Sequence, residues 1–169
     1  MKKSRDKGNN YELHICRRMS EWWFGKSFDK VKGGELPFRR TPLSGGWDKR
    51  EGSDVNLMQE GEEFPFSIEC KNQEKWSWDS LFKGGEKNPI WGYWEQCEKA
   101  AKEKNKVPLL IFSKNFNPDY VMMSAVTWGM FPDKKGRMSH IKIFMPDKAF
   151  VVTYMDELAK HITRKDLGY

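Results

Sequence analysis

Two short stretches decide the fold: Gly52-Ser53-Asp54-Val55 and Phe66-Ser67-Ile68-Glu69-Cys70-Lys71. Both are predicted strands, in which side chains two residues apart point to the same face of the sheet. Glu69 and Lys71 therefore share one face. When Val55 and Leu57 pair with Ile68 and Cys70 on the apolar face, Asp54 falls on the polar face too. Two carboxylates beside one ammonium suit the binding of a hard divalent cation and the activation of a water molecule.

This arrangement resembles the PD-(D/E)XK nuclease superfamily, although Ser53 stands where that motif has proline. The resemblance implies an α/β, restriction-endonuclease-like core with a central mixed β-sheet flanked by helices. It also implies metal ligands: Asp54, Glu69 and the backbone carbonyl of Cys70 would hold Mg²⁺, with Mn²⁺ as a substitute. Lys71 would orient the attacking water or stabilise charge near it.

A first helix is predicted from residue 9 or 10 to about residue 24, and Glu12 lies on its apolar stripe. One interpretation makes Asn9 the N-cap and Glu12 its capping-box partner. The other directs Glu12 to the metal site, because burial of an unpaired carboxylate is costly. The superfamily resemblance favours the second interpretation, since many members carry a glutamate on the first helix beside the site.

The segment Arg39-Arg40-Thr41-Pro42-Leu43-Ser44-Gly45-Gly46 narrows the resemblance. Read from Arg40, it is similar to the R-x-P-x-S-G segment of archaeal-type Holliday-junction resolvases. There the arginine and the serine lie at the edge of the active site, which makes Ser44 a candidate catalytic residue. The alternative is an ordinary surface loop with solvated arginines.

Residues 72–89 form a long connection in which basic and aromatic residues alternate, a pattern that suits contact with unstacked bases or a DNA backbone. A tryptophan-anchored flap over the core explains the same pattern. The predicted DNA-binding residues share a positive charge near the motif: Arg39, Arg40, Lys49, Arg50, Lys75 and Lys83.

A second helix is predicted over residues 90–105 and carries Gln96, which the resemblance places near the attacking water. Residues 107–113 form a continuous apolar run that predicts a strand buried on both faces. Strands at 120–124, 141–145 and 150–154 and helices at 125–131 and 155–163 follow. We expect a single nuclease domain over 1–169, with a basic flexible tail (1–8), a core (9–124) and a C-terminal extension (125–169).

Composition is consistent with an intracellular protein that binds a polyanion. The formal net charge is +6, which favours nucleic acid as a partner without establishing it. Three widely spaced cysteines, with no Cys/His cluster and no signal peptide, indicate a reducing, cytoplasmic setting and no structural zinc. The apolar runs are too short to cross a membrane.

Together these features predict a metal-dependent, structure-selective DNA endonuclease that resolves four-way junctions in branched double-stranded DNA. We expect a symmetric homodimer, because two paired nicks need two sites. Two alternatives stay open: a nuclease of the same fold with a restriction-type or flap target, and a non-catalytic DNA-binding protein on the same scaffold.

Overall fold

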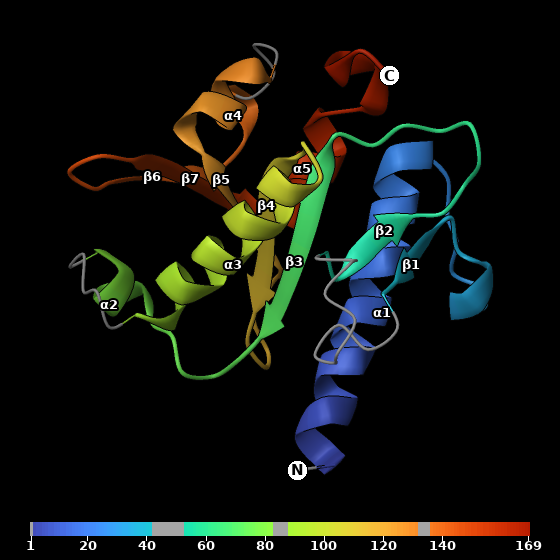
Figure 1. Cartoon of the computed structure of the whole chain (residues 1–169), viewed down its shortest axis with the longest axis horizontal. Coiled ribbons are helices and arrows are strands. Elements are labelled where there is room, and N and C mark those ends of the chain that lie inside the picture. The colour runs from blue at the N-terminus through green and yellow to red at the C-terminus, as the bar shows by residue number, and fades with distance from the viewer. Residues whose placement is uncertain (1, 42–52, 83–87, 132–135) are drawn as a thin grey trace.

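The structure is a computed structural model that describes residues 2–41, 53–82, 88–131 and 136–169, with side chains from Asp6 onward in the first helix. A mixed sheet of seven strands forms its centre, in the order β1-β2-β3-β4-β5-β7-β6 (Figure 1). The strands are β1 (Phe38–Arg40), β2 (Val55–Leu57), β3 (Phe66–Asn72), β4 (Val107–Ser113), β5 (Tyr120–Ser124), β6 (His140–Phe144) and β7 (Ala149–Tyr154). β3 and β4 run parallel, and the other neighbouring strands pair antiparallel. The predicted α/β architecture is confirmed.

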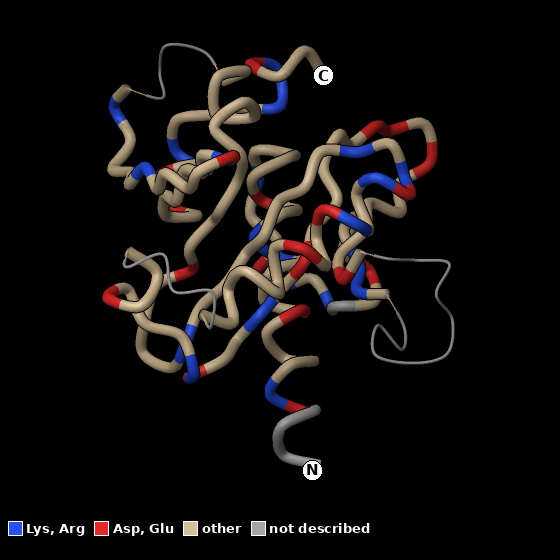
Figure 2. The backbone as a smooth tube through the Cα atoms, turned by 60° about the vertical axis from the view of Figure 1, so that its left-hand side comes forward, with Lys and Arg blue, Asp and Glu red and all other residues tan. Residues whose placement is uncertain are grey.

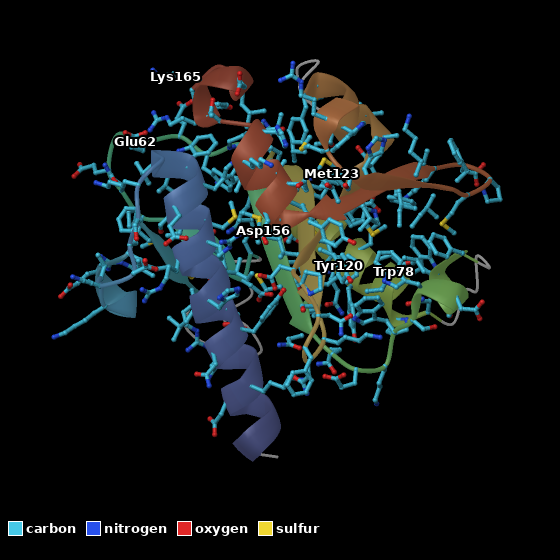
Figure 3. The ribbon with its side chains drawn as sticks, turned by 180° about the vertical axis from the view of Figure 1, so that it is seen from behind. Glu62, Trp78, Tyr120, Met123, Asp156 and Lys165 are labelled. Carbon is cyan, nitrogen blue, oxygen red and sulfur yellow. The ribbon has the colours of Figure 1, made fainter. Side chains whose placement is uncertain are left out.

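Helices cover both faces of this sheet. They are α1 (Lys2–Phe24), α2 (Trp78–Phe82), α3 (Pro89–Glu103), α4 (Ala125–Met130) and α5 (Met155–His161), with short 3-10 turns η1 (Gly33–Glu35) and η3 (Arg164–Leu167). α3 lies in front of the sheet in Figure 1, and α1 lies in front of it in the view from behind (Figure 3).

The alternation along the central strands creates two apolar cores, one on each face. Ile68 and Cys70 of β3, with Leu109 and Ile111 of β4, belong to the cluster under α1. Leu110 and Phe112 of β4 belong to the cluster under α3. β4 is thus buried on both faces, as its continuous apolar run predicts.

The first helix begins earlier than predicted. α1 starts at Lys2, so Asn9 lies inside the helix and cannot cap it, which removes the capping-box interpretation of Glu12. Once the apolar stripe of α1 is anchored on the sheet, each further turn costs little, and Gly8 is a weak obstacle. Lys7 also fastens this extension, with its Nζ 2.9 Å from Oε1 of Glu74.

The last third of the chain continues the same sheet. β7 pairs with β5 from Tyr120↔Tyr154 to Ser124↔Phe150, and β6 pairs with β7 to form a hairpin at the edge of the sheet. This part also contacts α1: the indole Nε1 of Trp22 donates to the Ile162 carbonyl at 2.6 Å, and Arg18 pairs with Asp156, which Figure 3 marks on α5.

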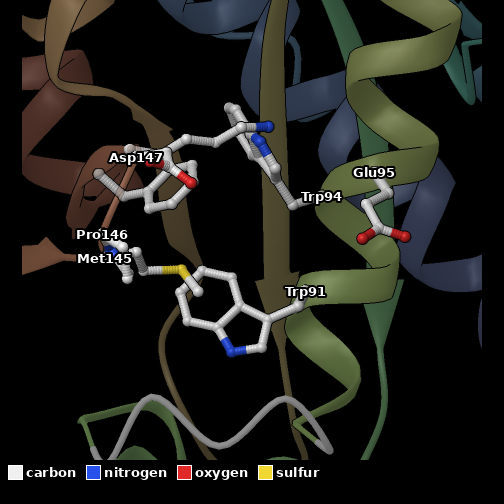
Figure 4. A pocket seen from close by; sticks show the side chains of 8 residues that line it. Trp91, Trp94, Glu95, Met145, Pro146 and Asp147 are labelled. Atoms are coloured by element: carbon white, nitrogen blue, oxygen red, sulfur yellow. The ribbon is translucent and has the colours of Figure 1, made fainter.

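The connection between β3 and α3 contains the anchoring tryptophan of the flap interpretation, and its contact with DNA stays a prediction. Trp76 is buried against Phe112 and Tyr120, as a tryptophan-anchored flap requires. Phe82, at the end of α2, is exposed. On the other flank of α3, the β6–β7 turn encloses a pocket lined by Trp91, Trp94, Glu95, Met145, Pro146, Asp147, Lys148 and Phe150 (Figure 4). None of the predicted site residues lines this pocket.

Within the described ranges, no helix combines the length and the apolar character that a membrane span requires.

We expect Asn88→Ala to destabilise the fold. The buried Asn88 caps α3, because its Oδ1 accepts from the Ile90 backbone N–H at 3.0 Å and its Nδ2 donates to the Ser77 carbonyl at 3.2 Å. Loss of such a cap costs about 1 kcal/mol, which lowers the midpoint of thermal unfolding by roughly 2–4 °C. Calorimetry checks this result, with the exposed Gln59→Ala as control, and an unchanged midpoint would contradict it.

Candidate active site

The site forms where β2 separates from β3. The two strands pair at Val55↔Ile68, and the Asp54 backbone N–H donates to the Ile68 carbonyl at 2.8 Å. Beyond this point the Asp54 side chain takes the place of a strand partner, since its Oδ2 accepts from the Cys70 backbone N–H at 2.8 Å. One buried carboxylate is thereby fixed against the middle of β3.

The predicted polar face is observed. Val55, Ile68 and Cys70 all lie in the apolar cluster under α1, so Asp54, Glu69 and Lys71 alternate away from it. Asp54 and Glu69 are only 7% and 8% exposed. Lys71 forms an ion pair with Glu69.

Electrostatics link these three side chains. Burial, and then the charge of Asp54, raise the pKa of Glu69 to about 7, against the opposing effect of Lys71. For Lys71, burial alone would lower the pKa, but the nearby carboxylates of Glu69 and Asp54 outweigh it and raise the pKa. Without a metal ion, the site has too little positive charge to balance its two buried acids.

Glu12 reaches the same region from α1. Its side chain is 13% exposed and lies 3.1 Å from Nε of Arg40. Arg40 also donates through Nη2 to Oδ1 of Asn9 at 2.6 Å. Burial and the charge of Asp54 raise the pKa of Glu12, while Arg40 lowers it. Arg40, predicted to contact DNA phosphates, is therefore held by α1 beside the site.

The donor set fits a hard divalent cation. Within the described ranges, no three His, Cys, Asp or Glu side chains converge as a ready metal cage. Two carboxylates with few further protein ligands suit Mg²⁺, which usually keeps several waters and binds through one or two carboxylates. Asp54 and Glu69 could hold such an ion, and its charge would relieve their mutual repulsion.

Sequence reasoning missed Tyr93. This α3 residue is half-buried, and Nζ of Lys71 lies 5.6 Å from the centre of its ring. A cation over an aromatic face is stabilised electrostatically. Only its position three residues before Gln96 links Tyr93 to the predicted site, and that spacing alone does not distinguish it from a core residue.

The remaining predicted residues are exposed or lie outside the described chain. Gln96 is exposed on α3, and Lys75 is exposed in the connection after β3. Arg39 is exposed and donates through Nε to the Leu36 carbonyl at 3.2 Å. Ser44, Lys49, Arg50 and Lys83 lie outside the described residues. Basic and acidic residues are interspersed along the chain (Figure 2), so charge alone does not locate a DNA-binding face.

A mixed sheet flanked by helices, with two buried acids and a lysine where two strands diverge, fits the PD-(D/E)XK class of nucleases. The family model described as "Phage putative PDDEXK endonuclease" matches residues 3–168, so the chain belongs to this endonuclease family. Neither a search of curated proteins nor a search of solved structures found a match to the chain. PD-(D/E)XK nucleases generally use divalent metal ions, and the family implies DNA as the substrate.

We expect Glu69→Gln to stabilise the metal-free protein at pH 8. Below pH 4.5, the ordinary pKa of glutamate, the carboxyl is protonated in both folded and unfolded chains. As the pH rises from there through about 7, the unfolded chain releases the proton first, so wild-type stability falls. Glutamine avoids this loss.

Thermal unfolding in EDTA at pH 4 and pH 8 measures the effect. The midpoints of Glu69→Gln and wild type should agree at pH 4, and the variant should unfold several degrees higher at pH 8. The exposed Glu60→Gln serves as control. A variant less stable than wild type at pH 8 would refute this account of the site.

Proposed function

We propose that this protein is a Mg²⁺-dependent endonuclease that hydrolyses DNA phosphodiester bonds, with Mn²⁺ able to substitute. The observation that carries the proposal is the convergence of Asp54, Glu69 and Lys71 at the divergence of β2 and β3. A bound divalent ion supplies charge that neutralises the reacting phosphate and lowers the pKa of a water molecule.

Each residue of the candidate active site has a distinct part in this proposal. Asp54 and Glu69 would hold the ion, with the backbone carbonyl of Cys70 as a further ligand. One oxygen of Asp54 is fixed by the Cys70 N–H. Lys71 orients the attacking water and stabilises negative charge on the phosphate, with Tyr93 and Glu69 fixing its ammonium group.

Other residues support this centre. Glu12 would support the metal site from α1, and Arg40 fixes its carboxylate beside Asp54. Gln96 positions the water and Ser44 contacts the DNA at the edge of the site, both on the strength of the family resemblance. The exposed Arg39 and Lys75 are available to phosphates, and Lys49, Arg50 and Lys83 complete the proposed DNA-binding set.

We expect Asp54→Asn and Lys71→Ala to abolish or severely slow Mg²⁺-dependent DNA cleavage. Asp54→Asn removes a charge needed to hold the ion, and DNA binding should survive or tighten because negative charge near phosphate is lost. Lys71→Ala should slow cleavage by roughly a hundredfold or more, as loss of an electrostatic stabiliser does. Nicking of supercoiled plasmid measures both, with Glu60→Gln and Lys99→Ala as exposed controls. Wild-type rates in either site variant would disprove the assignment.

The finer proposal is resolution of four-way junctions by a symmetric homodimer. Its support is the segment from Arg40 to Gly46, of which Arg40 and Thr41 belong to the described chain. Two symmetric nicks require two sites, and two-fold dimers are the commonest assembly.

The substrate test compares a labelled four-way junction, a flap, a linear duplex and single-stranded DNA, each with and without Mg²⁺. Paired symmetric nicks in the junction, well above duplex cleavage, are expected. Preferential cleavage of the duplex or the flap would indicate another target of the same nuclease. Metal-dependent nicking of none of them would leave a DNA-binding protein without catalysis.

A further inference from the structure

A polar groove begins one residue beyond the candidate active site. Asn72 directly follows Lys71 on β3, and its side chain therefore points to the opposite face of the sheet. The groove lies between the N-terminal half of α1 and the turn after β4. Its lining residues are Asp6, Lys7, Asn10, Tyr11, Asn72 and Asn115.

The walls of this groove are tied together before any ligand binds. Oε1 of Glu74 accepts from Nζ of Lys7 at 2.9 Å and from the backbone N–H of Asn115 at 3.0 Å. These two bonds join α1, the segment after β3 and the turn after β4. On the α1 side, Tyr11 is buried, and its hydroxyl donates to Oδ1 of Asp119 at 3.1 Å. The groove is thus a built feature of this edge of the sheet.

A strained and exposed aromatic residue directly follows the groove residue Asn115 in the chain. Phe116, next to the groove residue Asn115, has φ of 61° and is fully exposed. A bulky residue in the left-handed region is a strained outlier. The turn keeps this conformation through the Ser113 hydroxyl, which lies within hydrogen-bond distance of the Asn117 and Pro118 carbonyls at 3.1 and 3.0 Å.

The chemistry of the groove favours a base over a phosphate. Lys7 is the basic residue among those that line the groove, and Glu74 neutralises its charge. The carboxylate of Asp6 would repel a phosphate. Asn10, Asn72 and Asn115 offer amides that both donate and accept, as the polar edge of a base requires. An exposed ring beside such amides resembles a stacking platform for single-stranded nucleic acid.

We propose that this groove binds an unpaired nucleotide of the DNA substrate, with its base stacked on Phe116 and its polar edge against the asparagine amides. This inference rests on the proposed nuclease function and deepens it, because the groove would select DNA that has an unpaired base beside the cleavage site. A paired base has no free face for Phe116 and keeps its hydrogen-bonding edge occupied.

The test compares a gapped DNA with a fully paired duplex of the same sequence. Binding is measured by fluorescence anisotropy in Ca²⁺, and a 2-aminopurine base at the gap reports stacking. Phe116→Ala should weaken binding to the gapped DNA by about tenfold, the usual effect of one lost base–aromatic stack, and should remove the 2-aminopurine signal. Phe116→Trp should restore both readouts, and Asn72→Ala should weaken binding to the gapped DNA.

The matched control is Phe144→Ala, which removes a phenylalanine that is also exposed, on the edge strand β6. It should bind both DNAs as wild type does. The inference is overturned if Phe116→Ala leaves gapped-DNA binding unchanged or weakens binding to both DNAs equally. If wild type shows the predicted stacking and yet cleaves no DNA, the proposed nuclease function fails while the groove assignment stands.

Discussion

The site depends on one hydrogen bond. Where β2 leaves β3, the carboxylate of Asp54 accepts from the Cys70 backbone N–H in place of a strand carbonyl. A backbone donor in the middle of a sheet must find an acceptor, and here a side chain supplies it. This contact holds Asp54 near Glu69, and both acids are buried. Two packed cores, one on each face of β3 and β4, hold the strands in that arrangement.

The flanking helices complete the site from opposite faces. α1 brings Glu12 toward Asp54, where Arg40 of β1 pairs with it, and α3 brings the ring of Tyr93 over Lys71. Each contact joins residues that are distant in sequence. The raised pKa of Glu69 follows from burial and from Asp54, so the chain without a cation carries an electrostatic penalty that a divalent ion would remove. Structure and chemistry therefore agree with the endonuclease family to which the chain belongs.

Local patterns predicted much of this fold because strands have a simple period. The bounds of β4 and β5 match the apolar runs at 107–113 and 120–124, and strand alternation correctly grouped Asp54, Glu69 and Lys71. The pairing of Arg40 with Glu12 and the position of Tyr93 had no local signature, since both arise from helix packing on the sheet. The early start of α1 was missed because polar residues 2–8 resemble a tail. Local patterns could not show that residues 149–154 pair with β5, because this pairing joins strands that are distant in the sequence.

The most direct test of the central claim is a crystal structure of the protein grown with Mn²⁺, with anomalous scattering used to locate the metal. The account predicts one strong anomalous peak bound by carboxylate oxygens of both Asp54 and Glu69, with Lys71 beside it. An ion bound elsewhere in the chain, or an Mn²⁺-saturated crystal with no peak between these two carboxylates, would contradict it.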